Sequence, residues 1–441
     1  MCIRDRVYYS GTSEPIAKAE YKLPFAKTME MTGECLNPSM NVMARSGYVN
    51  CRAVNQRRLD IRGAVNITAV VIAAREEQVV TGGEGGGIQL REQNIACGRM
   101  VGEVTREIKI NEMLEPVYGK PEIKNILRCC ATPRLIDQKT ADGKIVIKGE
   151  LQVHMLYCAM TGGCEQMEFI IPTALVIDMP EATEGCSTRI GQELCYCTVE
   201  PDAQDNDRKV IALDAAIAVT ATVHCPAKAT ICTDCYSTKC KCDFRSKTMN
   251  TLRYEQVLND PVVTREVMQL PDNVETVIDL WCDVADTKSH TDKGDLCIEP
   301  KVSVSMLAKM RDGDIYYFDK NMDVEHRVQC SEKDAIMVGN VSVVGTDFNF
   351  AGNDSVEIRC ELNVAGVVYS PAKFSCIDNV ELDETKEPDS KVQRGLYLYL
   401  TSPGENMWDI AKRYNTGANN IEEENEAENG NVPRVLIIPV L

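Results

Sequence analysis

Five cysteines lie close together in the middle of the chain and form its densest group of metal-binding residue types. Cys225, Cys232, Cys235, Cys240 and Cys242 all fall between positions 225 and 242. The last four could supply four thiolates to one tetrahedral zinc ion. The final pair, however, has a single intervening residue, whereas zinc pairs are usually separated by about two to four. We therefore expect no metal, with structural zinc at Cys232, Cys235, Cys240 and Cys242 as the alternative.

The other residue types with catalytic potential are dispersed. His154, His224, His290 and His326 have neither metal nor triad spacing, and we interpret His154, on the polar face of an expected strand, as solvent-exposed. The glycine-rich residues 81–87 lack the Gly-Lys-Ser/Thr sequence of a phosphate-binding loop, so they are typical of a flexible hairpin loop. No pair of carboxylates stands out as acid and base. We predict that the protein is not an enzyme and needs no cofactor.

Length, charge and cysteine content limit the classes of function. A chain of 441 residues is too long for one hydrophobic core and indicates several domains. With 66 acidic and 48 basic residues, its formal net charge is −18, which disfavours a nucleic-acid partner. No stretch is apolar for long enough to span a bilayer. The 21 irregularly spaced cysteines indicate reduced thiols that pack as small apolar side chains in a cytosolic protein.

An alternating pattern of apolar and polar residues occurs three times along the body of the chain. Every second residue is apolar across residues 61–71, 213–223 and 358–368. Because side chains on a strand point alternately to opposite faces, each segment should bury one face in an antiparallel sheet. The pattern therefore predicts three equivalent strands.

A second kind of strand also recurs, together with the turn before it. Residues 145–155 follow the turn Asp142-Gly143, and residues 298–308 follow Lys293-Gly294. The unit that repeats is therefore roughly 150 residues long, which is too long for a solenoid and typical of a separate domain. We predict a mainly β protein of tandem antiparallel domains.

The last segment, residues 396–441, contains signals for two strands and two helices. Its opening run of leucine and tyrosine suits a strand, and Pro403-Gly404 supplies a turn. Asn406 and Asp409 resemble a capping box, which predicts the start of a helix. A second short helix follows, and the final aliphatic run is typical of a strand. We expect a small α+β module in the order strand, helix, helix, strand.

This segment resembles the LysM module. The residues responsible are Pro403-Gly404, Trp408-Asp409-Ile410-Ala411, Tyr414, Asn425 and residues 435–439. Most LysM modules bind N-acetylglucosamine polymers through two loops. Here Glu405-Asn406 replaces the usual Asp-Thr, and Pro433-Arg434 replaces the usual Gly-Gln. These departures count against glycan binding. We interpret Trp408 as a buried core residue, and expect Trp408, Ile410 and Ile437 to hold the module folded.

The repeats resemble the SPOCS domain of clostridial spore-coat assembly proteins. Residues 52–63 lie close to that family's asparagine–arginine–leucine–aspartate signature, and residues 234–239 match its closing motif. Val104-Thr105-Arg106-Glu107 recurs at residues 263–266. Several SPOCS copies followed by one LysM module is the layout of SipL-like proteins. The resemblance implies a non-enzymatic protein of the mother-cell cytoplasm at the forespore surface, whose LysM module docks onto the ATPase of the coat basement layer.

The resemblance and the composition together give an expected domain organisation. Residues 1–6 do not fit the pattern and are expected to be a junction, so the natural N-terminus and any signal peptide are not assessable. The charged, proline-containing segment before the last module is a linker. The expected domains are residues 7–103 (a partial first SPOCS copy), 104–243, 244–380, the linker 381–395 and the LysM module 396–441.

Three functions remain open from the sequence. The first is a spore-coat adaptor that binds the morphogenetic ATPase, the second a LysM protein that binds peptidoglycan or another N-acetylglucosamine glycan, and the third a zinc module at the cysteine cluster. The domain layout favours the adaptor. Acidic residues crowd the last module, so its partner should be basic. The residues expected to contact it are Ser402, Pro403, Glu405, Asn406, Asn425 and Glu428.

Overall fold

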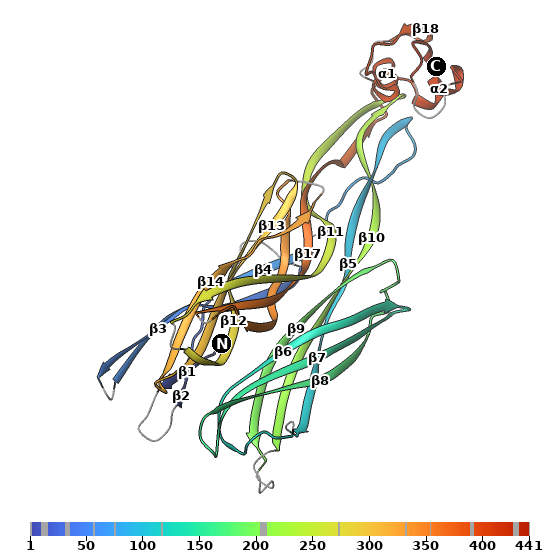
Figure 1. Ribbon diagram of the computed structural model, residues 1–441. Coiled ribbons are helices and arrows are strands. Elements are labelled where there is room, and N and C mark those ends of the chain that lie inside the picture. The colour runs from blue at the N-terminus through green and yellow to red at the C-terminus, as the bar shows by residue number, and fades with distance from the viewer. Residues whose placement is uncertain are drawn as a thin grey trace. The chain divides into compact units, whose positions relative to one another are not determined.

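A computed structural model describes most of the chain (Figure 1). The described residues are 2–9, 16–30, 36–55, 58–74, 76–115, 118–202, 210–271, 274–330, 333–352, 354–388, 392–426 and 432–440. They divide into two compact units. Unit 1 comprises Met1–Ala74, Gly98–Cys225 and Tyr254–Ser370, and unit 2 comprises Arg75–Cys97, Pro226–Arg253 and Pro371–Leu441.

The prediction of a mainly β fold is confirmed. The described residues form two short helices, and every other regular element is a strand. Each strand pairing with a recorded register is antiparallel. The long strands β5 (Ile88–Leu114), β10 (Ile211–Ser237), β11 (Lys241–Gln269) and β17 (Ser355–Asp383) contribute residues to both units.

The first large core of unit 1 lies between two three-stranded sheets. These sheets have the orders β6-β7-β8 and β5-β10-β9. Alternate residues from Leu213 to Val223 are buried, as the sequence pattern predicts, and they pack against Ile145, Leu151 and Val153. The strands are β5 (Ile88–Leu114), β6 (Ile123–Ala141), β7 (Lys144–Ala159), β8 (Cys164–Asp178), β9 (Ser187–Pro201) and β10 (Ile211–Ser237).

The second core of unit 1 repeats this arrangement. One sheet has the order β12-β13-β14 with β15 paired to β13, and the other has the order β11-β17-β16. Alternate residues from Ile358 to Val368 are buried against Ile298, Val302 and Val304. The strands are β11 (Lys241–Gln269), β12 (Val274–Asp292), β13 (Asp295–Met310), β14 (Ile315–Asp323), β15 (His326–Gln329), β16 (Ile336–Phe350) and β17 (Ser355–Asp383).

The same turn precedes the central strand in both cores. Asp142 and Gly143 have φ angles of 51° and 73°, and Lys293 and Gly294 have φ angles of 52° and 96°. Positive φ at both turn residues matches the right-handed twist of the flanking strands, as in type I′ hairpins. Each turn fixes the register of its hairpin, with Ala141 opposite Lys144 in the first.

The N-terminal part of unit 1 consists of two-stranded ribbons. β1 (Cys2–Tyr9) pairs with β2 (Ala17–Pro24), and β3 (Leu36–Asn55) pairs with β4 (Arg58–Ala74). Residues 2–6, which the sequence pattern sets apart, are therefore part of a strand. The expected burial of one face across residues 61–71 is wrong: no residue of this segment is buried, because the described elements do not cover it with a second layer, and Val70 alone packs against a core cluster.

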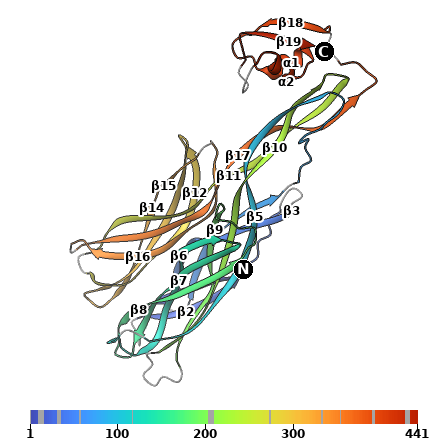
Figure 2. The ribbon, with the colours of Figure 1, turned by 90° about the vertical axis from the view of Figure 1, so that its right-hand side faces the viewer.

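Unit 2 contains the last four elements of the chain (Figure 2). β18 (Gly395–Leu400) pairs with β19 (Val435–Val440), and α1 (Met407–Tyr414) and α2 (Ala418–Glu424) lie on one side of this sheet. The order is strand, helix, helix, strand. β17 continues to Asp383, so the first three residues of the expected linker belong to a strand.

Candidate functional site

The C-terminal module, residues 395–440, has a small core on the helical side of its sheet. Tyr397 and Tyr399 face the helices, and their ring centroids lie 5.4 and 5.7 Å from that of Tyr414. Ile410 and Ile421 are fully buried among them. Aromatic rings supply a large apolar area, which a module of this size needs because little of its surface is buried.

The other side of the same sheet is an exposed apolar face. Leu396, Leu398 and Leu400 expose 71%, 76% and 69% of their surface. Leu398 lies opposite Ile437 and Leu400 opposite Val435, and both partners are also exposed. Ile437 therefore points away from the core, so the expectation that it holds the module folded is wrong. We call Leu396, Leu398, Leu400, Val435 and Ile437 the apolar face.

Glu405, one of the predicted contact residues, is held within the module. Its carboxylate accepts hydrogen bonds from Tyr399 Oη at 2.7 Å and from the Ser402 backbone N–H at 2.9 Å, and it pairs with Arg413 at 3.2 Å. The Ser402 N–H, the tyrosine hydroxyl and the guanidinium together lower the pKa of Glu405. Its charge thus stabilises the loop before α1.

The two predicted asparagines also make internal hydrogen bonds. Asn406 Oδ1 accepts the backbone N–H of Asp409 at 2.9 Å, so Asn406 is the N-cap of α1, as predicted. Asn425 donates to the Ile437 carbonyl and accepts the Ile437 N–H, both at 2.7 Å, and thereby joins α2 to β19. Ser402 and Pro403 are exposed, and Glu428 lies outside the described residues.

Within unit 2, helix α1 contacts residues 234–240, which we call the platform. Trp408 Nε1 donates to Asp234 Oδ2 at 2.8 Å, and Lys412 Nζ lies 2.6 Å from Asp234 Oδ1. Tyr236 Oη donates to the Thr416 carbonyl at 2.7 Å, and its ring packs edge-on against Trp408 at 5.0 Å. The prediction for Trp408 is thus incomplete: its side chain is half-buried and its indole N–H binds Asp234 of the platform.

The last two residues of the glycine-rich segment support the platform, while residues 81–85 are exposed. Ser237 Oγ donates to the Gly86 carbonyl at 2.5 Å, and the Thr238 N–H donates to the Gly87 carbonyl at 3.0 Å. Gly87 has a φ of +69°, and a Cβ atom there would lie 2.6 Å from Thr238 Oγ1. Glycine is required at this position because any side chain would collide with the platform.

The predicted cysteine ligands divide between several partners. Cys235 and Cys242 face each other with their sulfur atoms 3.7 Å apart. Cys232 packs against Ile377, and Cys240 contacts Ser237 and the Gly86 carbonyl. In the described part of the chain, no three histidine, cysteine or acidic side chains are grouped so that they could hold a metal ion. The zinc content remains a prediction for metal analysis.

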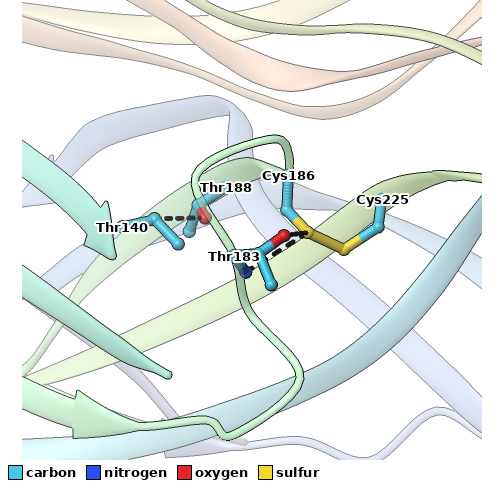
Figure 3. Close-up of a disulfide and its surroundings, with 5 residues drawn as sticks. All are labelled: Thr140, Thr183, Cys186, Thr188 and Cys225. Atoms are coloured by element: carbon cyan, nitrogen blue, oxygen red, sulfur yellow. Dashed lines mark hydrogen bonds between the residues drawn. A yellow bond between two sulfur atoms is a disulfide. The ribbon is translucent and has the colours of Figure 1, made fainter. Parts of the chain in front are cut away.

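The prediction that all thiols are reduced is wrong at one pair in unit 1. Cys186 and Cys225 form a disulfide that joins the loop before β9 to β10 (Figure 3). The Thr183 hydroxyl lies 3.3 Å from Cys186 Sγ, and Thr140 and Thr188 share a hydrogen bond nearby. The two cysteines are 39 residues apart, so irregular spacing in sequence did not reveal their proximity.

His154 is not the solvent-exposed residue that its strand position predicts. Its Nε2 lies 3.0 Å from Asp279 Oδ1 and its Nδ1 lies 3.2 Å from Glu168 Oε1, with 25% of its side chain exposed. Burial acts to lower the pKa of His154, but the hydrogen bond and charge of Asp279 and the hydrogen bond to Glu168 outweigh it and raise that pKa. The contact joins β7 to β12 within unit 1.

The comparison with known families matches one segment. Residues 122–211 match the family model described as SipL, SPOCS domain. This segment begins just before β6 and ends at the first residue of β10, so it lies in the first large core. No curated protein and no solved structure matches the chain. In the described part of the chain, neither helix is long enough to cross a membrane.

Proposed function

Starting from a SipL-like chain that contains a SPOCS domain at residues 122–211, we propose that the protein is a non-enzymatic adaptor in spore-coat assembly. In this proposal the C-terminal module is a LysM module that docks onto the ATPase of the coat basement layer. The family match supports a sporulation-related role. The apolar face of the module supports docking onto a protein.

The apolar face is the observation on which this proposal rests. Five aliphatic side chains lie together on a two-stranded sheet, and the three leucines among them each expose most of their surface to water. Contiguous exposed apolar patches of this kind mark protein interaction sites. A polysaccharide presents hydroxyl groups, which lose hydrogen bonds to water and find no partners on aliphatic side chains. The face therefore favours a protein partner over a glycan.

The charge of the module indicates the chemistry of that partner. Glu423, Glu424 and Glu426 are exposed around the end of α2, and Glu422 is half-buried. A basic partner surface beside an apolar patch would complement both features, and the charges would mainly raise the association rate. Because such attraction is screened by salt, binding should weaken as ionic strength rises.

Glu405, Asn406 and Asn425 make hydrogen bonds within the module, so they are poor positions at which to test partner binding by substitution. Substituting these residues would disturb the fold of the module and the partner contact together. Leu398 and Leu400 are better targets, because their side chains project from the sheet without entering the core. Glutamine preserves the approximate size of leucine while adding polar atoms.

The test is capture of the coat ATPase by the full chain and by a Leu398→Gln, Leu400→Gln variant. The matched control is Ile170→Gln with Val176→Gln, which changes two equally outward residues of β8 that are 63% and 55% exposed. Loss of central apolar contacts should weaken capture by about tenfold or more in the first variant alone. Chitin oligomers and peptidoglycan are assayed in parallel. Saturable glycan binding without ATPase capture would reject the adaptor and favour the glycan alternative.

A further inference from the structure

We propose that Cys235 and Cys242 are an oxidisable thiol pair, which a small-molecule disulfide such as oxidised glutathione converts to an intramolecular disulfide within the platform. The proposal goes beyond coat docking, because it concerns a covalent modification of the surface on which helix α1 rests. It depends on the geometry of unit 2 and not on the identity of any partner.

The two sulfur atoms are already in contact. Cys235 lies near the end of β10 and Cys242 near the start of β11, and their Sγ atoms are 3.7 Å apart. A disulfide requires about 2.05 Å between the sulfur atoms. The reaction therefore needs a local adjustment of two neighbouring side chains at one tight turn.

The surroundings of the pair determine which thiol reacts first. Cys235 is 1% exposed in a small apolar cluster with Ile377, whereas Cys242 is partly open to solvent at the edge of the same cluster. An oxidant dissolved in water can thus reach Cys242 and not Cys235. Cys232 belongs to the same apolar cluster, and Cys240 bonds to Ser237, but the sulfur contact of Cys242 is with Cys235.

The chemical step is a two-stage thiol–disulfide exchange. The Cys242 thiolate attacks one sulfur of oxidised glutathione, the glutathione S–S bond breaks, and one glutathione thiolate leaves. The Cys235 thiolate then attacks Cys242 Sγ in this mixed disulfide and displaces the second glutathione. Two protein thiols are oxidised, one glutathione disulfide is reduced to two thiols, and the two protein protons pass to the departing thiolates.

The reaction should be slow at neutral pH and faster in mildly alkaline solution. Burial, and then the neighbouring Cys242, raise the pKa of Cys235 to about 12, and burial also raises the pKa of Cys242. The thiolate is the nucleophile, so its small fraction limits both stages. The positive charge of the Lys412 ammonium group favours both thiolates and so offsets part of this increase in the two pKa values.

Oxidation would stiffen the part of the platform that holds the module. The bond would close a short ring containing Tyr236, Ser237 and Thr238. Tyr236 binds the Thr416 carbonyl, Ser237 binds Gly86, and the Thr238 carbonyl accepts from Asn415 at 3.3 Å. Amide hydrogen exchange at residues 234–240 and 407–416 should therefore slow in the oxidised protein.

The experiment uses the reduced full chain equilibrated with defined ratios of oxidised to reduced glutathione. Free thiols are then blocked, and the protein is digested with trypsin and mapped by mass. Trypsin cuts after Lys228, Lys239 and Lys241, so Cys240 and Cys242 fall on separate peptides. Cys232 and Cys235 share one peptide, and fragmentation of the cross-linked peptide shows which of the two is bonded. We expect a Cys235–Cys242 cross-linked peptide that forms faster as pH rises from 7 to about 9.

Two variants give matched controls. Cys235→Ser should stop at the mixed disulfide on Cys242, because the second nucleophile is missing. Cys195→Ser removes an exposed cysteine elsewhere and should leave the cross-link unchanged. The proposal is overturned if wild-type protein with native circular dichroism keeps both thiols blocked as free cysteines at every glutathione ratio. It is equally overturned if Cys242 bonds to Cys232 or Cys240 instead.

Discussion

At the scale of single residues, the buried carboxylate of Asp279 in unit 1 requires two partners to compensate its charge. Its side chain is fully buried, 2.9 Å from the Arg128 guanidinium and 3.0 Å from His154 Nε2. The guanidinium also lies 4.3 Å from the centre of the Trp281 ring. Burial acts to raise the pKa of Asp279, but the hydrogen bond from His154 and the charge of Arg128 outweigh it and lower that pKa. Both partners are needed, because an unpaired buried charge is costly.

This triad makes the stability of unit 1 depend on pH. The folded pKa of His154 is raised, so its contribution is fully present below the unfolded pKa of about 6.5 and is lost as pH rises through the folded value. His154→Gln should lower the free energy of unfolding by about 1–3 kcal/mol at pH 6, with a smaller effect at pH 9. Urea unfolding across this range provides the measurement. Parallel stability curves for the two proteins would contradict the role given to His154.

Local signals in the sequence predicted single-residue roles where the partner is close along the chain. The Asn406 cap of α1 is an example, because its partner Asp409 is three residues away. The role of Asp234 was not predicted, since its partners Trp408 and Lys412 are more than 170 residues distant. The Cys186–Cys225 disulfide was missed for the same reason. Proximity that depends on tertiary structure leaves no local pattern.

At the scale of elements, the period-two pattern predicted the buried strands wherever a second sheet covers them. Residues 213–223 and 358–368 bury alternate side chains against an opposing sheet. The same pattern failed at residues 61–71, which lie in a two-stranded ribbon. The separate expectation that Ile437 holds the module folded failed because its strand has its core on the other face. Periodicity identifies a strand, but the neighbouring elements decide which face is buried.

Gly87, at the end of the glycine-rich segment, lies against the platform and allows a test by substitution. Gly87→Ala would place a Cβ atom 2.6 Å from Thr238 Oγ1 and 2.7 Å from Lys239 Cγ, with a φ of +69°. Strain and steric overlap should destabilise unit 2 by about 1–3 kcal/mol. Gly83→Ala is the control, because its nearest neighbour would be Leu90 Cδ1 at 3.7 Å. Hydrogen exchange at residues 76–97 should accelerate in the first variant, and equal exchange in both would contradict the required glycine.

At the scale of the whole molecule, unit 2 combines the platform with the C-terminal module. Residues from three separate stretches of the chain meet there, including the glycine-rich segment and the ends of β10 and β17. The sequence predicted a charged linker before the module and no contact for helix α1. In the structure α1 binds Asp234 and Tyr236, while the apolar face of the module lies on the opposite side of its sheet from the helices. Attachment to the platform and the proposed docking of a partner therefore use different surfaces.

Asp234→Ala separates these two roles. The substitution removes the acceptor of the Trp408 indole and the partner of Lys412, so α1 should detach from the platform more often. Limited proteolysis within residues 384–394 should then accelerate severalfold, because fewer contacts protect that segment. Asp214→Ala, which removes an exposed carboxylate bonded to Tyr196, is the control. Capture of the ATPase should stay within about twofold of wild type, since the apolar face is unchanged. Unaltered proteolysis would show that Asp234 does not hold the module, and lost capture would show that the platform belongs to the partner's binding surface.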